Sequence, residues 1–277
     1  MIQIVEAGPW ASIQDGGRPG YAHLGVGRSG AFDQPALRLA NRLVGNPPDA
    51  AAIEITLGGL ELLVRDAVTV ALTGAPCAGL DWGTPTTVPA GTRIRLATPS
   101  SGLRSYLALR GGVDCASTLG SRSTDVLGGL GPAPLRAGDL LPVGAPPDCG
   151  VSESAAVPVK LPTTQLPATI RILPGPRDDW FAPGALTQLL QTDWLVRADS
   201  DRIGIRLDGP PLERVRGGEL PSEATLPGAL QVPPDGRPIL LGPDSPVTGG
   251  YPVIAVALAG GLGIAAQLRP GDRLGFR

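Results

Sequence analysis

Glycine and proline interrupt this chain so often that only short regular elements fit between them. Together they make up about a quarter of the 277 residues, with 40 Gly and 31 Pro. Proline breaks helices and removes a donor from strands, and glycine favours turns. Because the apolar fraction of 42% is ordinary for a globular protein, the pattern predicts many turns between short strands rather than disorder.

Short apolar runs rich in β-branched residues and bounded by Gly or Pro are typical of strands. They lie at residues 67–73, 92–97, 106–109, 168–173, 238–241 and 253–258. A helix is expected after Asp33, a good N-cap, with Pro35 in its first turn and Gly45 at its end. A second, shorter helix is expected over residues 185–191.

A repeated sequence pattern predicts a duplicated β-domain. The pattern L-R-x-G-D-x-L occurs at residues 135–141 and again at 268–274. A Pro-, Ser- and Val-rich stretch at 146–167 has the composition of a linker. We therefore expect an N-terminal β-domain over residues 1–150 and a C-terminal one over 165–277. The alternative is that the repeated pattern is only a common turn before a strand.

Composition and charge argue against several classes of protein. The net charge of −2 gives no electrostatic reason to bind nucleic acid. The three cysteines are widely spaced without a CxxC pair, so neither a zinc ribbon nor a redox pair is predicted. No signal peptide and no apolar run long enough to span a bilayer is recognised. We expect a cytoplasmic protein without a metal site, nucleic-acid partner or membrane contact.

Standard catalytic signatures are missing from the sequence. His23 is the one histidine, so any Ser-His-Asp or Cys-His system would have to use it. Neither a GxSxG elbow nor a GxxxxGK[ST] phosphate loop occurs. A GxGxxG pattern at 25–30 lacks the following βαβ context, which favours a Gly-rich turn. Any chemistry is therefore predicted to lie in polar loops.

The first polar loop spans residues 14–33 and mixes acidic, basic and hydroxyl side chains with glycines that can turn backbone N–H groups toward a ligand. This composition suits an anionic or carboxylate-bearing molecule. We assign candidate catalytic roles to Asp15, Arg18 and His23, and a substrate-binding role to Ser29. A turn at Asp15 and a plain structural role for His23 are the alternatives.

A second loop, 120–125, carries hydroxyl and guanidinium donors on Ser121, Arg122 and Ser123 that could hold a phosphate or carboxylate. An ion pair of Arg122 with Asp125 that closes a turn is an equal alternative.

Two further polar regions lie in the second half of the chain. Their candidate substrate-binding residues are Ser222, Glu223, Gln231 and Tyr251. Three structural interpretations stand beside this one. Tyr251 could be a packing ring with a solvated hydroxyl, residues 248–252 could be a turn that leads into an edge strand, and Asp201 could form an ion pair with Arg202.

Taken in order, these segments resemble one family. The runs QDGGRPGYAHLGVGRSGAFD, LANRLVGN and IEITLGG are similar to the N-terminal signature of the biotin-dependent carboxyltransferase-like family. Further matches are YLALRGGVD, LGSRSTD, SDRIGIRL, GALQVPPDGRPILL, TGGYPVI and AAQLRPGD. The family includes the C subunit of bacterial ATP-dependent 5-oxoprolinase, often labelled allophanate hydrolase subunit 2, and is related to part of the carboxyltransferase domain of urea carboxylase.

The resemblance implies a mainly β fold with a few short helices, arranged as two cyclophilin-like β-barrel domains. It also implies a subunit that is inactive alone and that, with B-type and A-type partner subunits, uses ATP as co-substrate to open the lactam 5-oxoproline to glutamate. The ATP could bind at the partner interface. The lone lysine, Lys160, lacks the Ala-Met-Lys-Met context of a biotin attachment site, so no covalent biotin is expected on this chain.

Two other functions stay open at this point. One is a carboxyltransferase-type component that acts on urea or another amide, with biotin supplied by a different chain. The other is a non-catalytic regulator of the B-like subunit. Gly27, Pro246 and Gly261 stand where the family usually has Pro, Gln and Asp, which leaves room for a diverged substrate.

Overall fold

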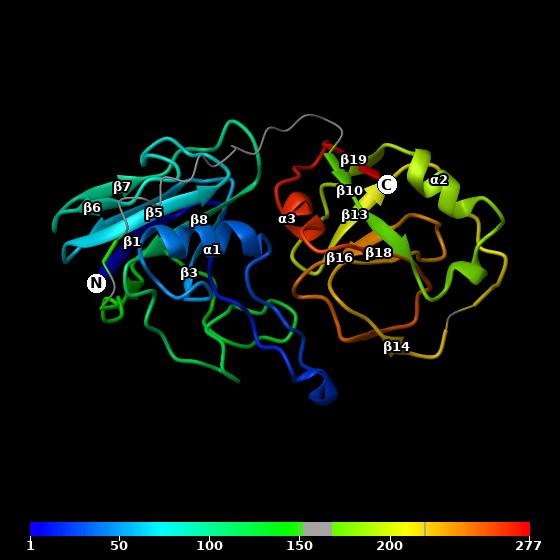
Figure 1. Cartoon of the computed structure of the whole chain (residues 1–277), viewed down its shortest axis with the longest axis horizontal. Coiled ribbons are helices and arrows are strands. Elements are labelled where there is room, and N and C mark those ends of the chain that lie inside the picture. The colour runs from blue at the N-terminus through cyan, green and yellow to red at the C-terminus, as the bar shows by residue number, and fades with distance from the viewer. Residues whose placement is uncertain (149, 152–167, 219) are drawn as a thin grey trace. The chain divides into compact units, whose positions relative to one another are not determined.

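The computed structural model describes residues 1–148, 150–151, 168–218 and 220–277 (Figure 1). Its contacts group the chain into two compact units. The first unit comprises Met1–Arg18, Asp33–Asp125 and Gly129–Thr163, and the second comprises Pro19–Phe32, Val126–Gly128 and Thr164–Arg277. The domain bounds of 1–150 and 165–277 stay a prediction, and this grouping differs from them chiefly in the two short segments 19–32 and 126–128. The expected linker lies largely outside the described residues.

Two sheets build the first unit. The four-stranded sheet has the order β7 (Arg93–Arg95), β4 (Leu60–Val64), β1 (Ile2–Ala7) and β9 (Leu140–Leu141). The five-stranded sheet has the order β2 (Trp10–Gln14), β3 (Ala52–Thr56), β8 (Arg104–Leu109), β5 (Val68–Gly74) and β6 (Thr86–Val88). All of these pairings are antiparallel.

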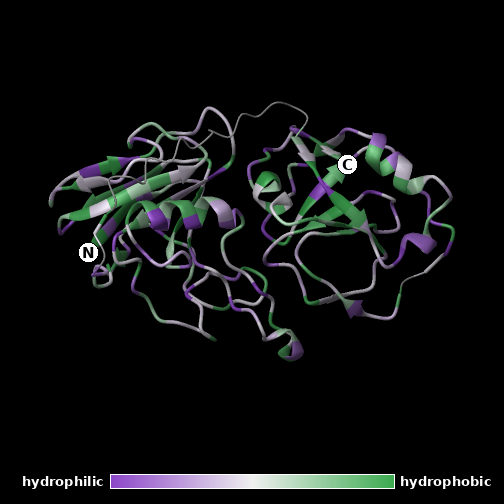
Figure 2. Cartoon of the chain, in the orientation of Figure 1, coloured by the Kyte–Doolittle hydropathy of each residue, from purple (hydrophilic) through white to green (hydrophobic). Residues whose placement is uncertain are grey.

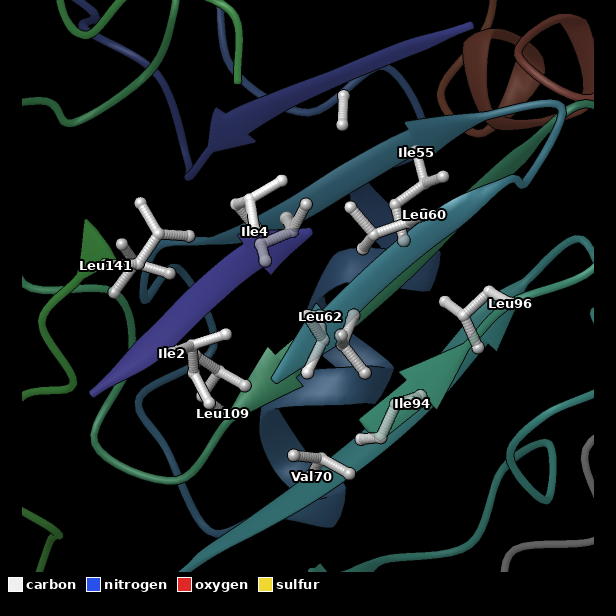
Figure 3. Close-up of a cluster of buried hydrophobic side chains, with 14 of the residues drawn as sticks. Ile2, Ile4, Ile55, Leu60, Leu62, Val70, Ile94, Leu96, Leu109 and Leu141 are labelled. Atoms are coloured by element: carbon white, nitrogen blue, oxygen red, sulfur yellow. The ribbon is translucent and has the colours of Figure 1, made fainter. Parts of the chain in front are cut away.

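Aliphatic side chains from both sheets form one core (Figure 3). Alternate residues of each strand point inward, as the period of two requires, so Ile2 and Ile4 of β1 lie in the core beside Val64 and Leu62, their antiparallel partners on β4. Strand β8 is buried along its whole length. One face of β8 contributes to this core, and the helix α1 (Gln34–Leu43) packs against β8 and β5.

Helix α1 begins and ends as the sequence predicts. The carboxylate of Asp33 accepts a hydrogen bond from the Ala36 backbone N–H at 3.0 Å, and Pro35 lies in the first turn. Gly45 follows the helix at a φ of 76°, a left-handed conformation that glycine adopts without strain. The buried residues of α1 are Ala36, Leu37, Ala40, Leu43 and the polar Asn41.

An eight-stranded sheet builds most of the second unit. Its order is β10 (Ala168–Ile170), β19 (Arg273–Phe276), β12 (Trp194–Val196), β13 (Gly204–Asp208), β16 (Ile239–Leu241), β15 (Ala229–Gln231), β18 (Val253–Ala257) and β11 (Ile172–Pro174). Strands β14 (Glu223–Ala224) and β17 (Thr248–Gly249) form a separate pair. Figure 2 shows hydrophobic residues concentrated in the strands of each unit.

The strand predicted over 168–173 is wrong in one respect, because it is two strands. β10 pairs with β19 and β11 pairs with β18, at opposite ends of the strand order, yet only Arg171 separates them. Around that residue, Leu258 N–H donates to the Arg171 carbonyl at 2.8 Å and Arg277 N–H donates to the Ile170 carbonyl at 3.0 Å. The two ends of the sheet therefore meet, and the sheet forms a nearly closed barrel.

The same closure corrects a second expectation. The turn at residues 248–252 does not lead into an edge strand, because β18 lies between β15 and β11 and pairs with both. The other strands predicted from the sequence are confirmed, as is the helix α2 (Ala185–Gln191). A third helix, α3 (Gly261–Ala265), is an addition to the predicted elements. The fold is thus mainly β with a few short helices, as expected, while its description as cyclophilin-like rests on the resemblance.

The repeated L-R-x-G-D-x-L segment folds into the same turn in both units. Asp139 accepts from the backbone N–H of Arg136 at 2.7 Å, and Asp272 accepts from that of Arg269 at 2.8 Å. The glycine before each aspartate has a φ of 96° and 90°, respectively. In each unit this Gly-Asp pair also exchanges two backbone hydrogen bonds with a neighbouring strand, at Ile4 of β1 and Val196 of β12. This equivalence supports the predicted duplication.

Candidate functional site

The carboxylate of Asp15 organises the candidate site of the first unit. Its Oδ1 accepts hydrogen bonds from the Ser121 hydroxyl at 2.7 Å, the Ser123 hydroxyl at 2.5 Å and the Gly17 N–H at 2.7 Å. Its Oδ2 accepts from the Arg122 N–H at 2.6 Å. Four donors approach the number of lone-pair positions that a carboxylate offers. Asp15 therefore joins the loop after β2 to the loop 120–125 and has little capacity left to take a proton from a substrate.

Arg18 lies beside this carboxylate and is almost completely buried. Its Nη2 donates to the Ser123 carbonyl at 2.5 Å, and its Nη1 lies 3.4 Å from the Asp125 carboxylate. Within the described residues, the Nε of Arg18 has no hydrogen-bond partner. Gly131 is required nearby, because a Cβ there would lie 2.1 Å from the Ser123 carbonyl oxygen. The guanidinium is thus fixed against the loop.

The ion pair expected between Arg122 and Asp125 is wrong. Asp125 pairs with Arg18, whereas Arg122 donates to the Cys115 carbonyl at 2.8 Å and to Asp114 at 3.2 Å. The side chain of Arg122 therefore points back along the chain, while its backbone N–H donates a hydrogen bond to Asp15.

A buried polar chain lies under the start of α1. The hydroxyl of Tyr106 donates to Glu54 at 2.7 Å and accepts from the Asp33 N–H at 2.7 Å. Arg104 forms an ion pair with Glu54 at 3.7 Å. Burial, followed by the nearby carboxylates of Glu54 and Asp33, raises the pKa of Tyr106 well above its ordinary value. No sequence motif marks these residues, because their partners lie on different strands.

Replacing Tyr106 with phenylalanine should change how stability depends on pH. The folded-state pKa is raised, so the native state holds its proton more tightly than the unfolded chain, whose tyrosines titrate near about pH 10. The stabilisation is complete below that pH and declines as the pH rises toward the folded pKa. We expect the stability difference between wild type and Tyr106→Phe to be smaller at about pH 11 than at about pH 8 in urea unfolding. Equal differences at both values would contradict this expectation.

The second unit holds a buried ion pair that fixes two loops. Arg202 donates from Nε and Nη2 to both oxygens of Asp244, at 2.8 and 3.0 Å, and Nη2 also donates to the Gly30 carbonyl at 2.6 Å. Asp244 accepts from the Val126 N–H at 3.2 Å. Ser29, at an unusual φ of 51°, donates its N–H to the Pro243 carbonyl. The pair therefore holds the segments 19–32 and 126–128.

This geometry corrects the expected ion pair of Asp201 with Arg202. Asp201 instead accepts hydrogen bonds from the backbone N–H groups of Ile203 and Gly204, at 2.8 and 3.0 Å. The true partner of Arg202 lies 42 residues further along the chain.

The remaining predicted site residues of the second unit are dispersed. His23 is exposed in a short 3-10 helix, Ala22–Leu24, and its Nδ1 must donate to the Gly20 carbonyl at 3.0 Å, because a carbonyl can only accept. Ser222 is exposed. Glu223 pairs with Arg177, which lowers the pKa of the Glu223 carboxyl. Gln231 donates to the Tyr251 carbonyl at 3.3 Å.

The structure thus brings together Asp15, Arg18, Ser121, Arg122 and Ser123 in the first unit. It places His23, Ser29, Ser222, Glu223, Gln231 and Tyr251 in the second unit without gathering them into one cluster. Among the residues described, no group of three or more His, Cys, Asp or Glu side chains could hold a metal ion. No described helix is long and apolar enough to cross a membrane.

Fold and site define a two-unit β protein whose buried serine and arginine donors are arranged around fixed carboxylates. A model of the family described as carboxyltransferase domain, subdomain A and B, matches residues 24–277. The chain belongs to this family, as its motifs predict.

Relatives of two kinds match the chain. The C subunit of 5-oxoprolinase from Escherichia coli (strain K12) is 40% identical, and the alignment covers 100% of this chain and 90% of that protein. The corresponding protein of Haemophilus influenzae is 35% identical with the same coverage. Urea amidolyase of Lachancea kluyveri is 34% identical over 99% of this chain but only 17% of its own length.

A solved structure supports the fold. The crystal structure of the K. lactis urea amidolyase matches with a TM-score of 0.92 and 32% identity, over 99% of this chain. This chain spans only 18% of that structure. The likeness therefore concerns one part of a much larger protein.

Proposed function

We propose that this protein is the C-type subunit of an ATP-dependent 5-oxoprolinase and works with B-type and A-type partner subunits. The observation that carries the proposal is the similarity to the 5-oxoprolinase C subunits, which extends over the whole of this chain. The two 5-oxoprolinase relatives match over 90% of their own sequence, whereas the matching region makes up 17% of the urea amidolyase. Identity to the Escherichia coli C subunit, 40%, is also higher than the 34% identity to the urea amidolyase of Lachancea kluyveri.

The proposed reaction activates a lactam with ATP. The lactam oxygen of 5-oxoproline takes the γ-phosphoryl group, water adds to the activated carbon, and the ring C–N bond breaks. A second water releases phosphate, so that glutamate, ADP and phosphate leave. The buried Nε of Arg18, which has no hydrogen-bond partner among the described residues, is a donor that suits the negative charge that develops on oxygen. Because the chain has no P-loop, we place ATP at the assembled interface with a partner.

Within this proposal, Asp15 acts by holding the loops, not by accepting a proton. Its four hydrogen bonds fix Ser121, Arg122 and Ser123 relative to the loop after β2. His23, with Nδ1 tied to the Gly20 carbonyl, leaves Nε2 for a proton-transfer role. Arg18 and Arg122 supply positive charge.

The test is reconstitution. We would measure 5-oxoproline-dependent ADP and glutamate formation by this chain with its B-type and A-type partners, and with each protein omitted in turn. The proposal expects turnover only from the complete mixture. Turnover that continues without this chain, or none from a mixture whose complex demonstrably forms, would contradict it.

A carboxyltransferase-type role on urea or another amide is the second candidate, favoured by the close structural match to the K. lactis urea amidolyase. That role would need a biotin carrier on another chain, so avidin should abolish it and leave lactam opening untouched. A purely regulatory role makes a third outcome. In that case Arg18→Gln and Arg122→Gln would alter complex formation and leave turnover by the complex unchanged.

A further inference from the structure

A groove of about 270 Å³ opens on the second unit. It lies over β13 and β16, where Arg206 is the cross-strand neighbour of Ile239. Arg197 and Arg237 also line it, together with Tyr251 and Pro233. The carbonyl of Tyr251 accepts from Gln231 on the adjacent strand β15, which fixes the backbone that carries the tyrosine.

Arginines are the charged side chains that dominate the lining of the groove. Three arginines line it, and three carboxylates lie within 4.0 Å of their guanidinium groups, namely Asp199, Asp208 and Asp235. The fork geometry of arginine matches a carboxylate in particular.

Two of these arginines are held in place by acids beside the groove. Arg197 donates from Nε and Nη2 to both oxygens of Asp199, at 3.0 and 2.9 Å. Arg237 donates from Nε to Asp208 at 2.7 Å. These bonds fix the guanidinium groups yet leave Nη1 of Arg197 and Nη2 of Arg237 without a hydrogen bond to any described residue.

Arg206 differs from the other two. Within the described part of the chain its side chain makes no hydrogen bond, and its nearest acidic contact is a long one, 3.7 Å from Nε to Asp199. It lies between Arg197, which is hydrogen-bonded to Asp199, and the apolar side chain of Ile239. Arg206 therefore has donors available to a ligand in the groove.

We propose that this groove binds a small organic carboxylate, with its carboxylate on Arg206 and its carbon skeleton against Ile239 and Tyr251. The volume lies just below the usual range of about 300–1,000 Å³ for ligand pockets, which suits a molecule of amino-acid size. The chemical identity rests on the proposed function, whose substrate 5-oxoproline and product glutamate are both such carboxylates. The site is separate from the Asp15 cluster, which belongs to the other unit.

The experiment is a titration of the full chain without partners, followed by NMR and calorimetry. The probes are 5-oxoproline, glutamate, inorganic phosphate and 2-pyrrolidone, which is the 5-oxoproline ring without its carboxylate. We expect 5-oxoproline to bind, and 2-pyrrolidone to bind at least about tenfold more weakly. Arg206→Gln should weaken 5-oxoproline binding by about tenfold to a hundredfold, since it removes charge-assisted hydrogen bonds.

Two comparisons make the result decisive. Arg171→Gln changes an exposed arginine of the same unit outside the groove lining and should leave binding unchanged, and Arg206→Lys should retain an intermediate affinity. Unchanged binding by Arg206→Gln, or phosphate binding as tight as 5-oxoproline binding, would overturn the proposal. Because the titration needs no partner, its failure is distinguishable from an absence of turnover in the reconstituted mixture.

Discussion

Replacement of Arg202 with methionine should lower the free energy of unfolding by about 3–5 kcal/mol, the usual cost of leaving one member of a buried ion pair without its partner. Asp244 would keep only the Val126 N–H as a donor, and the Gly30 carbonyl would lose its hydrogen bond. Denaturant unfolding gives the stability. Hydrogen exchange at Ser29, whose N–H donates to Pro243, reports whether the loop is released.

Two comparisons separate charge from packing in this case. The double variant Arg202→Met, Asp244→Leu should recover most of the loss, because it removes both charges of this ion pair. Arg38→Met removes an ion pair with Asp49 in which both side chains are about half exposed, and should cost about 1 kcal/mol or less. A double variant as unstable as Arg202→Met would show that the charge of Asp244 is not the cause.

Removal of the carboxylate in Asp15→Ala should have an effect of similar size. Two serine hydroxyls and two backbone N–H groups would lose their acceptor in a buried loop, and hydrogen bonds to charged groups contribute about 1.5–3 kcal/mol each, without strict additivity. We expect a loss of about 3–5 kcal/mol and no 5-oxoproline turnover in the reconstituted mixture. Urea unfolding and the coupled assay measure the two effects.

Graded controls are available for the Asp15 cluster. Ser121→Ala removes one of the four hydrogen bonds and should cost about 1 kcal/mol. Asp66→Ala removes an exposed carboxylate that pairs with the N-terminal amine and should change stability by less than about 1 kcal/mol. If Asp15→Ala folds as stably as Asp66→Ala, the cluster does not organise the loops.

Local features were predictable from the sequence because their causes are local. The start of α1 follows from the Asp33 side chain and from Pro35, which lie within three residues of each other. The repeated Gly-Asp turn is set by one glycine at positive φ and one aspartate that reaches back three residues. Such interactions leave a readable pattern of residue types at fixed spacing.

Closure of the second sheet left no such pattern. Residues 168–173 alternate like a single strand, and the break at Arg171 exists only because β18 and β19 meet the chain there from opposite ends of the sheet. The position of β18 in the sheet interior has the same origin. Tertiary pairing decides both features, and neither leaves a local signal.

The candidate site shows the same difference between features with local causes and features set by tertiary pairing. Asp15, Ser121 and Ser123 stand out by residue type, and the structure joins them across more than 100 residues of sequence. The predicted partners of the arginines are wrong, because the prediction preferred charged neighbours in the sequence. Arg202 instead pairs with Asp244, and Arg18 with Asp125.

The most direct test of the proposed function compares the two candidate substrates in separate assays of the same assembled complex. This chain and its B-type and A-type partners would be supplied with ATP and either 5-oxoproline or urea, with and without avidin, while ADP and glutamate are counted. We predict ATP hydrolysis that depends on 5-oxoproline, produces one glutamate for each ADP, requires this chain and is insensitive to avidin. Hydrolysis that depends on urea and is abolished by avidin would contradict the proposed function and assign the chain to a carboxyltransferase.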